Sequence, residues 1–314
     1  MAELRIVFMG TPELACVSLE ALLRLSDFKV VAVVTQPDRP KGRDLKLQAS
    51  PVKELALKHG LPVLQPQKAR DEAFIGELRS LGPDLIVVAA FGQILPKAML
   101  EIPPYGCINV HTSLLPKYRG AGPIQWAILN DEKETGVTIM KMDVGMDTGD
   151  VITQDRTEIT PEDNAQTLHE RLAQMGAELL VRTIPDYVAG KIQPRPQPAE
   201  GVSLAPKIKK EEGRIDWQQP ARVIWNRVRG LVPWPGAFTV LKEGQRLLKI
   251  WEAEIVEGKS GKPGEILDLD RTGIVVGCGD GAIRLTMVQL EGGKRLSAEQ
   301  FLAGNRKAVG QGLG

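Results

Sequence analysis

The sequence predicts an α/β protein in which a Rossmann-like domain with a mostly parallel sheet precedes a small, OB-like C-terminal β-barrel domain. In the first 110 residues, short apolar runs alternate with helical patterns, an order typical of a parallel sheet covered by helices. After residue 207, short strand-like runs follow one another across tight turns, which is typical of a small barrel or sandwich. The length of 314 residues agrees with two domains.

The N-terminal half contains several apolar runs that indicate strands. The first, residues 4–8, ends at Gly10 and is followed by leucine and alanine at helical spacing over residues 12–25. Thr11 is the expected N-cap of that helix, because a proline follows it at the first helical position. The other runs are continuously apolar, as expected for strands covered on both faces, and comprise residues 29–35, 85–90 and 106–110.

A proline-rich stretch divides the chain. Residues 191–206 contain four prolines, a density that predicts an extended, semi-rigid linker. We therefore expect an N-terminal catalytic domain over residues 1–190, a linker over residues 191–206 and a C-terminal domain over residues 207–314. One helix is expected in the last part, at residues 221–229, followed by strands at residues 237–241, 247–252, 264–269, 273–278 and 282–288.

The net charge of +1 conceals an asymmetry between the two parts. Residues 207–314 carry 18 lysines and arginines against 13 acidic residues, whereas residues 1–206 carry 22 against 26. A basic C-terminal domain fits a polyanionic partner, although an excess of this size is also common in proteins that bind no nucleic acid. The long loop over residues 36–46 is either a solvated surface loop or a functional one, and its basic residues are Arg39, Lys41, Arg43 and Lys46.

Several classes of protein are excluded. The three cysteines and three histidines are scattered, so we expect neither a disulfide framework nor a protein-held metal. The first strand-to-helix turn lacks the glycine pattern of dinucleotide-binding proteins, and the chain has neither a P-loop nor a GxSxG elbow. No secretory signal or membrane span is recognisable, and we expect a cytoplasmic protein.

Asn109 and His111 form the most informative pair of polar residues. Side chains of a strand alternate, so both fall on one face at the carboxyl end of a predicted strand, the edge at which open α/β sheets bind ligands. A structural interpretation, in which local backbone groups satisfy both side chains, stays open at this point. An acidic loop follows with Asp143 and Asp147, and an aspartate placed near His111 would orient its imidazole. The spacing in this loop does not fit an EF-hand.

These residues lie in longer motifs that resemble the formyltetrahydrofolate-dependent formyltransferases. The motifs are Asn109-Val110-His111 with Ser113-Leu114-Leu115-Pro116, and Gly136-Val137-Thr138 with Asp143-Val144-Gly145 and Asp147-Thr148-Gly149. The resemblance covers the whole N-terminal domain and implies that Asn109, His111 and Asp147 are catalytic and that 10-formyltetrahydrofolate is the formyl donor. Thr112 departs from the glycine that many members have after the histidine.

The resemblance also implies a folate site across the same strand edge. The pterin would contact two loops, one with Phe91, Gln93, Ile94 and Leu95 and one with Asp143 and Val144. The formyl and p-aminobenzoate end would be lined by Ser113, Leu114, Leu115 and Pro116. Cys107 is expected to be a small core residue, because formyl transfer needs no covalent enzyme intermediate.

Further segments resemble those family members that act on initiator methionyl-tRNA. These are residues 8–13, residues 35–43 and, after the linker, residues 207–217, 226–229 and 233–236. The resemblance implies that the loop with Arg39, Lys41, Arg43 and Lys46 enters the acceptor stem of the tRNA. It also implies that the C-terminal domain binds the inside of the L-shaped tRNA, and we add Lys207, Lys209 and Lys210 as contacts. Arg119 is a candidate contact to an anion or to the tRNA, and a monomer without membrane contact is expected.

Three alternative functions stay open. A formyltransferase with the same core could act on a small amine, such as a sugar nucleotide or glycinamide ribonucleotide, and a hydrolase could release formate from the same folate. Neither explains the basic loop and the basic C-terminal domain. A non-catalytic RNA-binding protein would explain the basic residues, but it would have no need for the set of Asn109, His111 and Asp147.

Overall fold

The computed structural model describes residues 3–41, 46–242, 245–310 and 312–314. The chain forms two compact units. The first comprises Met1–Pro123, Glu134–Glu158 and His169–Ala205, and the second comprises Ile124–Lys133, Ile159–Leu168 and Pro206–Gly314. Most of the proline-rich stretch therefore lies within the first unit, while the domain boundaries inferred above stay a prediction.

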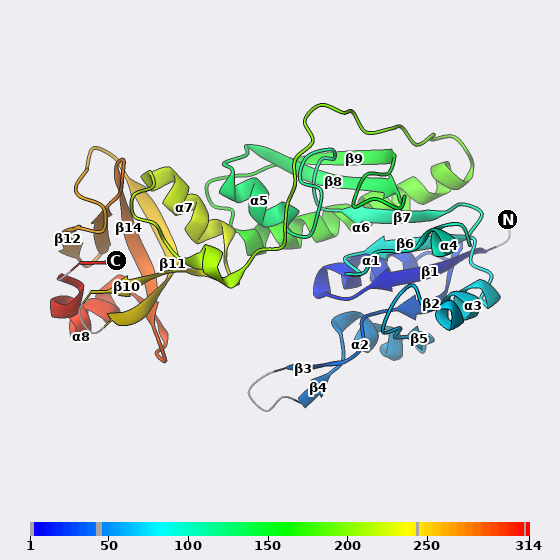
Figure 1. The fold of residues 1–314 in the computed structure, drawn as a ribbon, viewed down its shortest axis with the longest axis horizontal. Helices are drawn as coiled ribbons and strands as arrows, with labels where there is room; N and C mark the ends of the chain where they lie inside the picture. Colours follow the sequence, from blue (N-terminus) through cyan, green and yellow to red (C-terminus); the bar gives the residue numbers. More distant parts are fainter. Residues whose placement is uncertain (1–2, 42–45, 243–244, 311) are drawn as a thin grey trace. The chain divides into compact units, whose positions relative to one another are not determined.

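A seven-stranded sheet forms the centre of the first unit (Figure 1). Its strand order is β5-β2-β1-β6-β7-β8-β9, in which the first five strands are parallel and β8 runs antiparallel to its neighbours β7 and β9. The mostly parallel, Rossmann-like sheet is thus confirmed. The bounds are β1 Leu4–Gly10, β2 Phe28–Val34, β5 Val63–Leu64, β6 Leu85–Ala89, β7 Cys107–His111, β8 Glu134–Lys141 and β9 Val151–Glu158.

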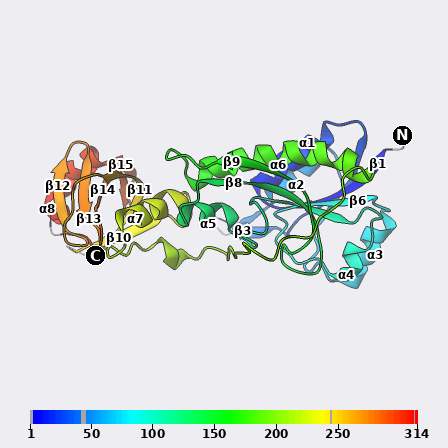
Figure 2. The ribbon, with the colours of Figure 1, turned by 90° about the horizontal axis from the view of Figure 1, so that it is seen from above.

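Helices cover both faces of this sheet. Figure 2 shows α1 (Glu13–Leu23) and α6 (Ala165–Val188) on one face, and α3 (Glu72–Ser80) and α4 (Lys97–Leu100) on the other. Local signals start two of the helices: the side chain of Ser50 caps α2 (Pro51–Lys58), and that of Asp71 caps α3. A short further helix, α5, spans Pro123–Leu129.

The predicted cap of α1 is wrong. Pro12, not Thr11, occupies the N-cap position, and no side chain caps this helix. The hydroxyl of Thr11 instead donates to the carbonyl of Phe91 at 3.1 Å and accepts from the backbone N–H of Gln36 at 3.4 Å. Thr11 therefore ties together the segments that follow β1, β2 and β6, because tertiary partners at the sheet edge compete with the local cap.

Packing against α6 decides which face of β7 carries its polar residues. A Cβ on Gly176 of α6 would lie 2.8 Å from a methyl group of Val110, so Val110 faces α6 at close range. Cys107 lies in the buried cluster that includes side chains of α3 and α4. Since side chains alternate along a strand, Asn109 and His111 share the face of Cys107, opposite α6.

The sheet of the second unit consists of antiparallel strands, in the part of the chain where a small β-barrel domain was predicted. The strand order is β10-β11-β14-β13-β12, and β15 pairs with β14. One core lies against this sheet and includes Trp217, Ile224 and Phe301. The elements are η1 Lys210–Gly213, α7 Ala221–Gly230, β10 Ala237–Leu241, β11 Arg246–Val256, β12 Ile266–Asp270, β13 Gly273–Gly277, β14 Ala282–Leu290, β15 Arg295–Ser297 and α8 Ala298–Gly310.

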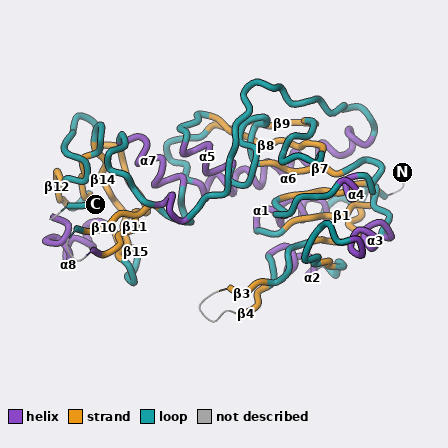
Figure 3. Tube along the Cα trace, in the orientation of Figure 1, coloured by secondary structure: helices purple, strands orange, loops and turns teal. Residues whose placement is uncertain are grey.

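Part of the long basic loop forms regular secondary structure. β3 (Arg39–Lys41) and β4 (Lys46–Gln48) form a two-stranded antiparallel hairpin (Figure 3). At its base, Asp38 accepts a hydrogen bond from Lys53 at 2.7 Å and one from Gln65 at 2.7 Å. The hairpin is therefore anchored to the first unit on the side from which its strands emerge.

Within the described ranges, no helix combines the length and apolar character needed to cross a membrane. Over the same residues, no three side chains of histidine, cysteine, aspartate or glutamate gather in a group that could hold a metal ion.

Candidate active site

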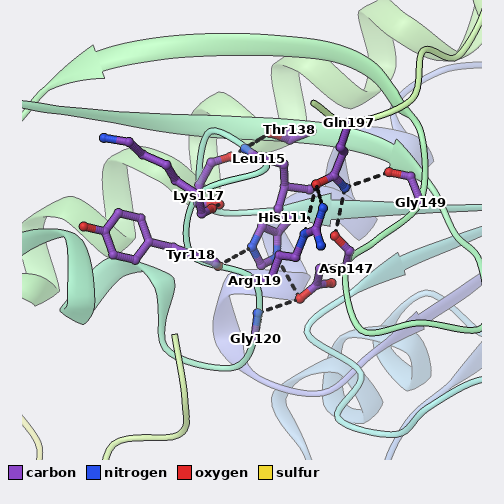
Figure 4. A network of polar contacts seen from close by, with 11 residues as sticks. His111, Leu115, Lys117, Tyr118, Arg119, Gly120, Thr138, Asp147, Gly149 and Gln197 are labelled. Carbon is purple, nitrogen blue, oxygen red and sulfur yellow. Dashed lines mark hydrogen bonds and ion pairs between the residues drawn. The ribbon is translucent and has the colours of Figure 1, made fainter. Parts of the chain in front are cut away.

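His111 stands between a carbonyl and a carboxylate at the end of β7 (Figure 4). Its Nε2 lies 3.0 Å from the backbone carbonyl of Tyr118, and because a carbonyl can only accept, Nε2 carries a proton. Its Nδ1 lies 3.7 Å from Oδ2 of Asp147. Asn109 and His111 are both buried, with 8% and 6% of their surface exposed. The structure thus brings His111 and Asp147 together. Asn109, the third predicted catalytic residue, lies two positions before His111 on the same face of β7.

Asp147 belongs to the loop between β8 and β9. Its Oδ2 accepts a hydrogen bond from the backbone N–H of Gly120 at 2.8 Å, and its φ of 53° lies in the left-handed region. The loop passes so close to β8 that a Cβ on Gly149 would lie 1.9 Å from the carbonyl oxygen of Lys141. Only glycine fits there, which explains one of the glycines that stand out in this segment of the sequence.

Asp143 has a different place in the same loop. One of its carboxylate oxygens accepts from the backbone N–H of Gly145 at 3.0 Å and from the hydroxyl of Thr148 at 2.7 Å. These are bonds within an exposed turn, so Asp143 shapes the loop. Asp147 is the aspartate of this pair whose carboxylate lies close to the ring of His111.

Residues that follow β7 form a tightly bonded loop. The Ser113 hydroxyl, fully buried, donates to the carbonyl of Lys117 at 2.6 Å, and the backbone N–H of Leu115 donates to the hydroxyl of Thr138 at 3.2 Å. The peptide between Leu115 and Pro116 is cis. A cavity of about 550 Å³ opens beside this loop and β9, and the predicted folate residues among its lining are Leu114, Leu115 and Pro116.

The two loops predicted to contact the pterin pack apolar residues in the same buried cluster. Phe91 and Leu95 are buried there, and Met142 packs against the same cluster. Both loops also expose an apolar side chain, since Ile94 is 77% and Val144 is 65% exposed. The side chain of Gln93 bonds to the backbone of Pro66 and Ala69, which fixes the first loop.

The predicted tRNA contacts lie in both units. Arg39 is exposed and its guanidinium donates to the side chain of Gln36 at 3.2 Å. Arg43 lies outside the described residues, as do the side chains of Lys41 and Lys46. In the second unit, the exposed basic residues at and before η1 are Lys207, Lys209 and Lys210.

Sequence reasoning missed several residues that build this site. Tyr118 and Gly120 contact the site through backbone groups. Every residue other than proline has the same backbone groups, so the residue type alone does not reveal such a contact. Gln197 bonds to Arg119 and to the loop of Asp147, yet it lies in the stretch predicted as a linker. Arg119, a candidate anion contact, therefore has its guanidinium bonded to Gln197.

Comparisons with known proteins agree with this architecture. Residues 4–184 match the model of the formyl transferase family, and residues 207–306 match that of the formyl transferase C-terminal domain. Curated relatives named methionyl-tRNA formyltransferase include one from Citrifermentans bemidjiense, 54% identical over 314 residues, which are 100% of this chain and 98% of the relative. Another, from Myxococcus xanthus, is 51% identical over 310 residues, 99% of this chain and 98% of the relative.

Solved structures with the same fold are more distant in sequence. The sugar 3N-formyl transferase WlaRD is 20% identical with a TM-score of 0.68, over 90% of this chain and 97% of that chain. HypX from Aquifex aeolicus, in complex with tetrahydrofolic acid, is 20% identical with a TM-score of 0.63, over 98% of this chain. The match spans about half of HypX, 48% of its length. At these identities the two structures show the fold alone.

The predicted resemblance is confirmed at the level of both the domains and the whole chain. The chain belongs to the formyl transferase family, in which it groups with the methionyl-tRNA formyltransferases that it matches over their full length.

Proposed function

We propose that the chain transfers the formyl group of 10-formyltetrahydrofolate to the amino group of methionine carried by initiator tRNA. The observation that carries the proposal is the contact between His111 and Asp147 beside Asn109, in a chain that matches methionyl-tRNA formyltransferases from end to end. A small amine as acceptor is not favoured, because the sugar formyltransferases share the fold at only 20–22% identity.

Negative charge develops on the formyl oxygen as the amine attacks, and the site offers donors for it. The amide N–H of Asn109 is one donor, on the strand face that also carries His111. Nδ1 of His111 is the second donor when the ring is in its charged form, with a proton on each nitrogen. Its distance of 3.7 Å from Asp147 exceeds a hydrogen bond, so this Nδ1–H can reach a substrate oxygen while the nearby carboxylate stabilises the positive charge.

Transfer also requires one proton to leave the attacking amine and one to reach the leaving nitrogen. The carboxylate of Asp147 can accept the first, directly or through a water molecule, and His111 can relay a proton because its ring faces that carboxylate. The bond from Gly120 to Asp147 leaves the second carboxylate oxygen to serve the substrate. The remaining acceleration comes from holding two large substrates together.

The residues present fit a folate as formyl donor. Ile94 and Val144 expose apolar side chains on two loops whose other apolar residues pack in one buried cluster. A flat ring system such as a pterin binds between apolar surfaces of this kind. The backbone groups of these loops can bond the polar edge of the pterin. When bound, 10-formyltetrahydrofolate supplies the formyl group, and the chain supplies orientation, donors and proton transfer.

The tRNA is held by basic residues of both units in this proposal. Arg43 is the loop residue expected to bond a phosphate or base edge bidentately, because its guanidinium presents paired donors that lysine lacks. The other contacts proposed are Arg39, Lys41, Lys46, Lys207, Lys209 and Lys210. We further propose that the protein acts as a cytoplasmic monomer.

Formylation itself provides the test. Labelled formyl from 10-formyltetrahydrofolate is offered to initiator and elongator methionyl-tRNA, with Asn109→Ala as the inactive control. Labelling of the initiator that is lost in the variant supports the proposal. Labelling of neither tRNA, with transfer to an amino sugar nucleotide instead, would replace tRNA by a small amine as the acceptor.

The basic loop can be tested separately. Arg43→Ala should raise the KM for tRNA and leave the KM for folate unchanged, whereas Arg70→Ala removes an exposed arginine of the same unit and should change neither. Protection of residues 41–46 from protease by tRNA would support the same contact. Equal cleavage with and without tRNA would contradict it.

A further inference from the structure

The proline-rich segment lies against the loops on both sides of His111. It runs without helix or regular strand after α6 (Figure 3), and all of residues 191–205 belong to the first unit. Two isolated bridges attach its backbone, one between Arg195 and Val151 and one between Leu204 and Arg119. The segment is therefore bonded to the start of β9 and to the loop that follows β7.

Gln197 uses its whole side-chain amide in this contact. Its Nε2 donates to the backbone carbonyl of Asp147 at 2.8 Å and to that of Gly149 at 2.7 Å. Its Oε1 accepts from Nε and a terminal nitrogen of Arg119 at 3.1 and 2.7 Å. An amide has two N–H donors and two acceptor lone pairs, so every hydrogen-bonding position of Gln197 is occupied (Figure 4).

These bonds act on the main chain of the residue that faces His111. Asp147 has a left-handed φ of 53°, a conformation that costs free energy for a residue other than glycine. Gln197 holds the carbonyl of Asp147 itself and that of Gly149, on either side of Thr148. A side chain from a distant part of the chain thus maintains the backbone geometry that directs the Asp147 carboxylate.

The two prolines beside Gln197 restrict the backbone at this position before any contact forms. It stands between Pro196 and Pro198, and a residue that precedes proline is restricted to extended conformations. The ring of Pro196 fixes its own φ as well. Little backbone freedom is therefore lost when the segment binds, and the amide reaches its partners at a low entropic cost.

The other end of the segment supports the second partner of His111. Ser203 accepts a hydrogen bond from the backbone N–H of Tyr118 at 2.9 Å, and the carbonyl of Tyr118 is the group that bonds His111. Nearby, a Cβ on Gly120 would lie 2.6 Å from the carbonyl oxygen of Ala205. The segment thus bonds to both residues that contact the imidazole, Asp147 through Gln197 and Tyr118 through Ser203.

We propose that Gln197 is a positioning residue for formyl transfer: it acts through Asp147 and holds that carboxylate beside His111, where the reaction needs it. The inference rests on the proposed function for its chemistry, but its structural part concerns only the geometry of Asp147 and His111. The stretch that looks like a linker in the sequence is on this view a wall of the active site.

The test compares Gln197→Ala and Gln197→Glu with Gln193→Ala. Glutamate keeps an acceptor for Arg119 but cannot donate to the two carbonyls. Gln193 is an exposed glutamine of the same segment whose side chain donates a local hydrogen bond to the carbonyl of Gly190, so its variant should behave as wild type. Both Gln197 variants should lose about tenfold to a hundredfold in kcat, as expected for a misplaced catalytic group, with little change in either KM.

Two further readouts separate positioning from general destabilisation. In an Asp147→Asn background, Gln197→Ala should cause little additional loss of kcat, because both changes remove the same interaction. The proton resonance of the His111 ring carbon between its nitrogens, assigned with His111→Gln, should shift in the Gln197 variants, while those of His59 and His169 should stay in place. This second readout needs no substrate.

Distinct results would overturn the inference. Wild-type kcat in both Gln197 variants, losses that add fully to those of Asp147→Asn, or an unchanged His111 resonance would each contradict it. A wild-type protein that formylates no methionyl-tRNA would contradict the proposed function instead, and the resonance shift would still decide whether Gln197 positions the pair.

Discussion

Asp147 and Tyr118 hold His111 from two sides, and both have left-handed backbone conformations, with φ of 53° and 61°. Such a conformation costs about 1–3 kcal/mol for a residue other than glycine, less for aspartate than for tyrosine. The surrounding bonds offset this cost: Gly120 donates to Asp147, and Ser203 accepts from Tyr118. We therefore expect the backbone at Asp147 and Tyr118 to relax if these hydrogen bonds were removed, which would change the position of both partners of His111.

The carboxylate of Asp147 should be essential for the rate and dispensable for folding. Asp147→Asn keeps an acceptor for Gly120 but removes the charge beside His111, so kcat should fall by about 10²–10⁴-fold, the usual range for a general acid or base. The thermal midpoint should stay near that of the wild type. Steady-state formylation and calorimetry measure the two effects.

Asp143→Asn is the matched control, because an asparagine oxygen can still accept from Gly145 and Thr148. Near wild-type activity is expected. A loss in Asp143→Asn as large as that in Asp147→Asn would show that the assignment of roles to the two aspartates is wrong.

Asn109 should contribute to the transition state more than to binding. Asn109→Ala removes an amide N–H on the strand face that carries His111, and the loss of one oxyanion donor typically lowers kcat by about 10²–10³-fold. The KM values for folate and tRNA should change little. A raised KM with an intact kcat would instead make Asn109 a binding residue.

The thiols should be unreactive. Burial raises the pKa of Cys107 to about 12 and, with nearby glutamates, that of Cys16 to about 11, while burial raises the pKa of Cys278 to about 11. A raised thiol pKa means less thiolate, so at pH 8 only about one part in a thousand or less is reactive. Iodoacetamide should label the native protein slowly and leave formylation intact. Rapid labelling of Cys107 with loss of activity would indicate a nucleophilic role.

Asp131 should stabilise the second unit in a pH-dependent way. Burial would raise its pKa, but hydrogen bonds from Asn226, Lys133 and Arg222 outweigh this and lower the pKa to about 2 from an ordinary 3.8. A lowered pKa in the folded state means that the stabilisation is present above pH 4 and is lost as the pH falls toward 2. Asp131→Asn should therefore lower stability at neutral pH by about 1 kcal/mol, discounted for a side chain that is 35% exposed.

Tryptophan fluorescence can follow this unit, because all five tryptophans belong to it: Trp126, Trp217, Trp225, Trp234 and Trp251. Urea midpoints of the wild type and Asp131→Asn should differ at pH 7 and converge between pH 4 and pH 2. Asp268→Asn, which breaks a pair exposed on both sides, should have a smaller effect. A difference between wild type and Asp131→Asn that is constant with pH would exclude the carboxylate as its source.

Local patterns accounted for part of each unit. Apolar runs predicted β1, β2, β6 and β7, and turn residues predicted the order of β10 to β14, because the periods of strands and helices are properties of neighbouring residues. The shared face of Asn109 and His111 follows from the same period of two. The antiparallel direction of β8 was not predicted, because it depends on packing within the whole sheet. The helix α8 was not predicted either, because its residues are ordered by packing against the core of the second unit.

By itself, the sequence determined the fold class, the family and the strand face that carries Asn109 and His111. Only the tertiary structure decided that Tyr118 bonds His111 through a backbone carbonyl, that Thr11 serves the sheet edge and not α1, and that Gln197 holds the loop of Asp147. The physical reason is the range of the interactions. Side-chain periodicity acts over a few residues, whereas these hydrogen bonds join segments that meet only after the chain has folded.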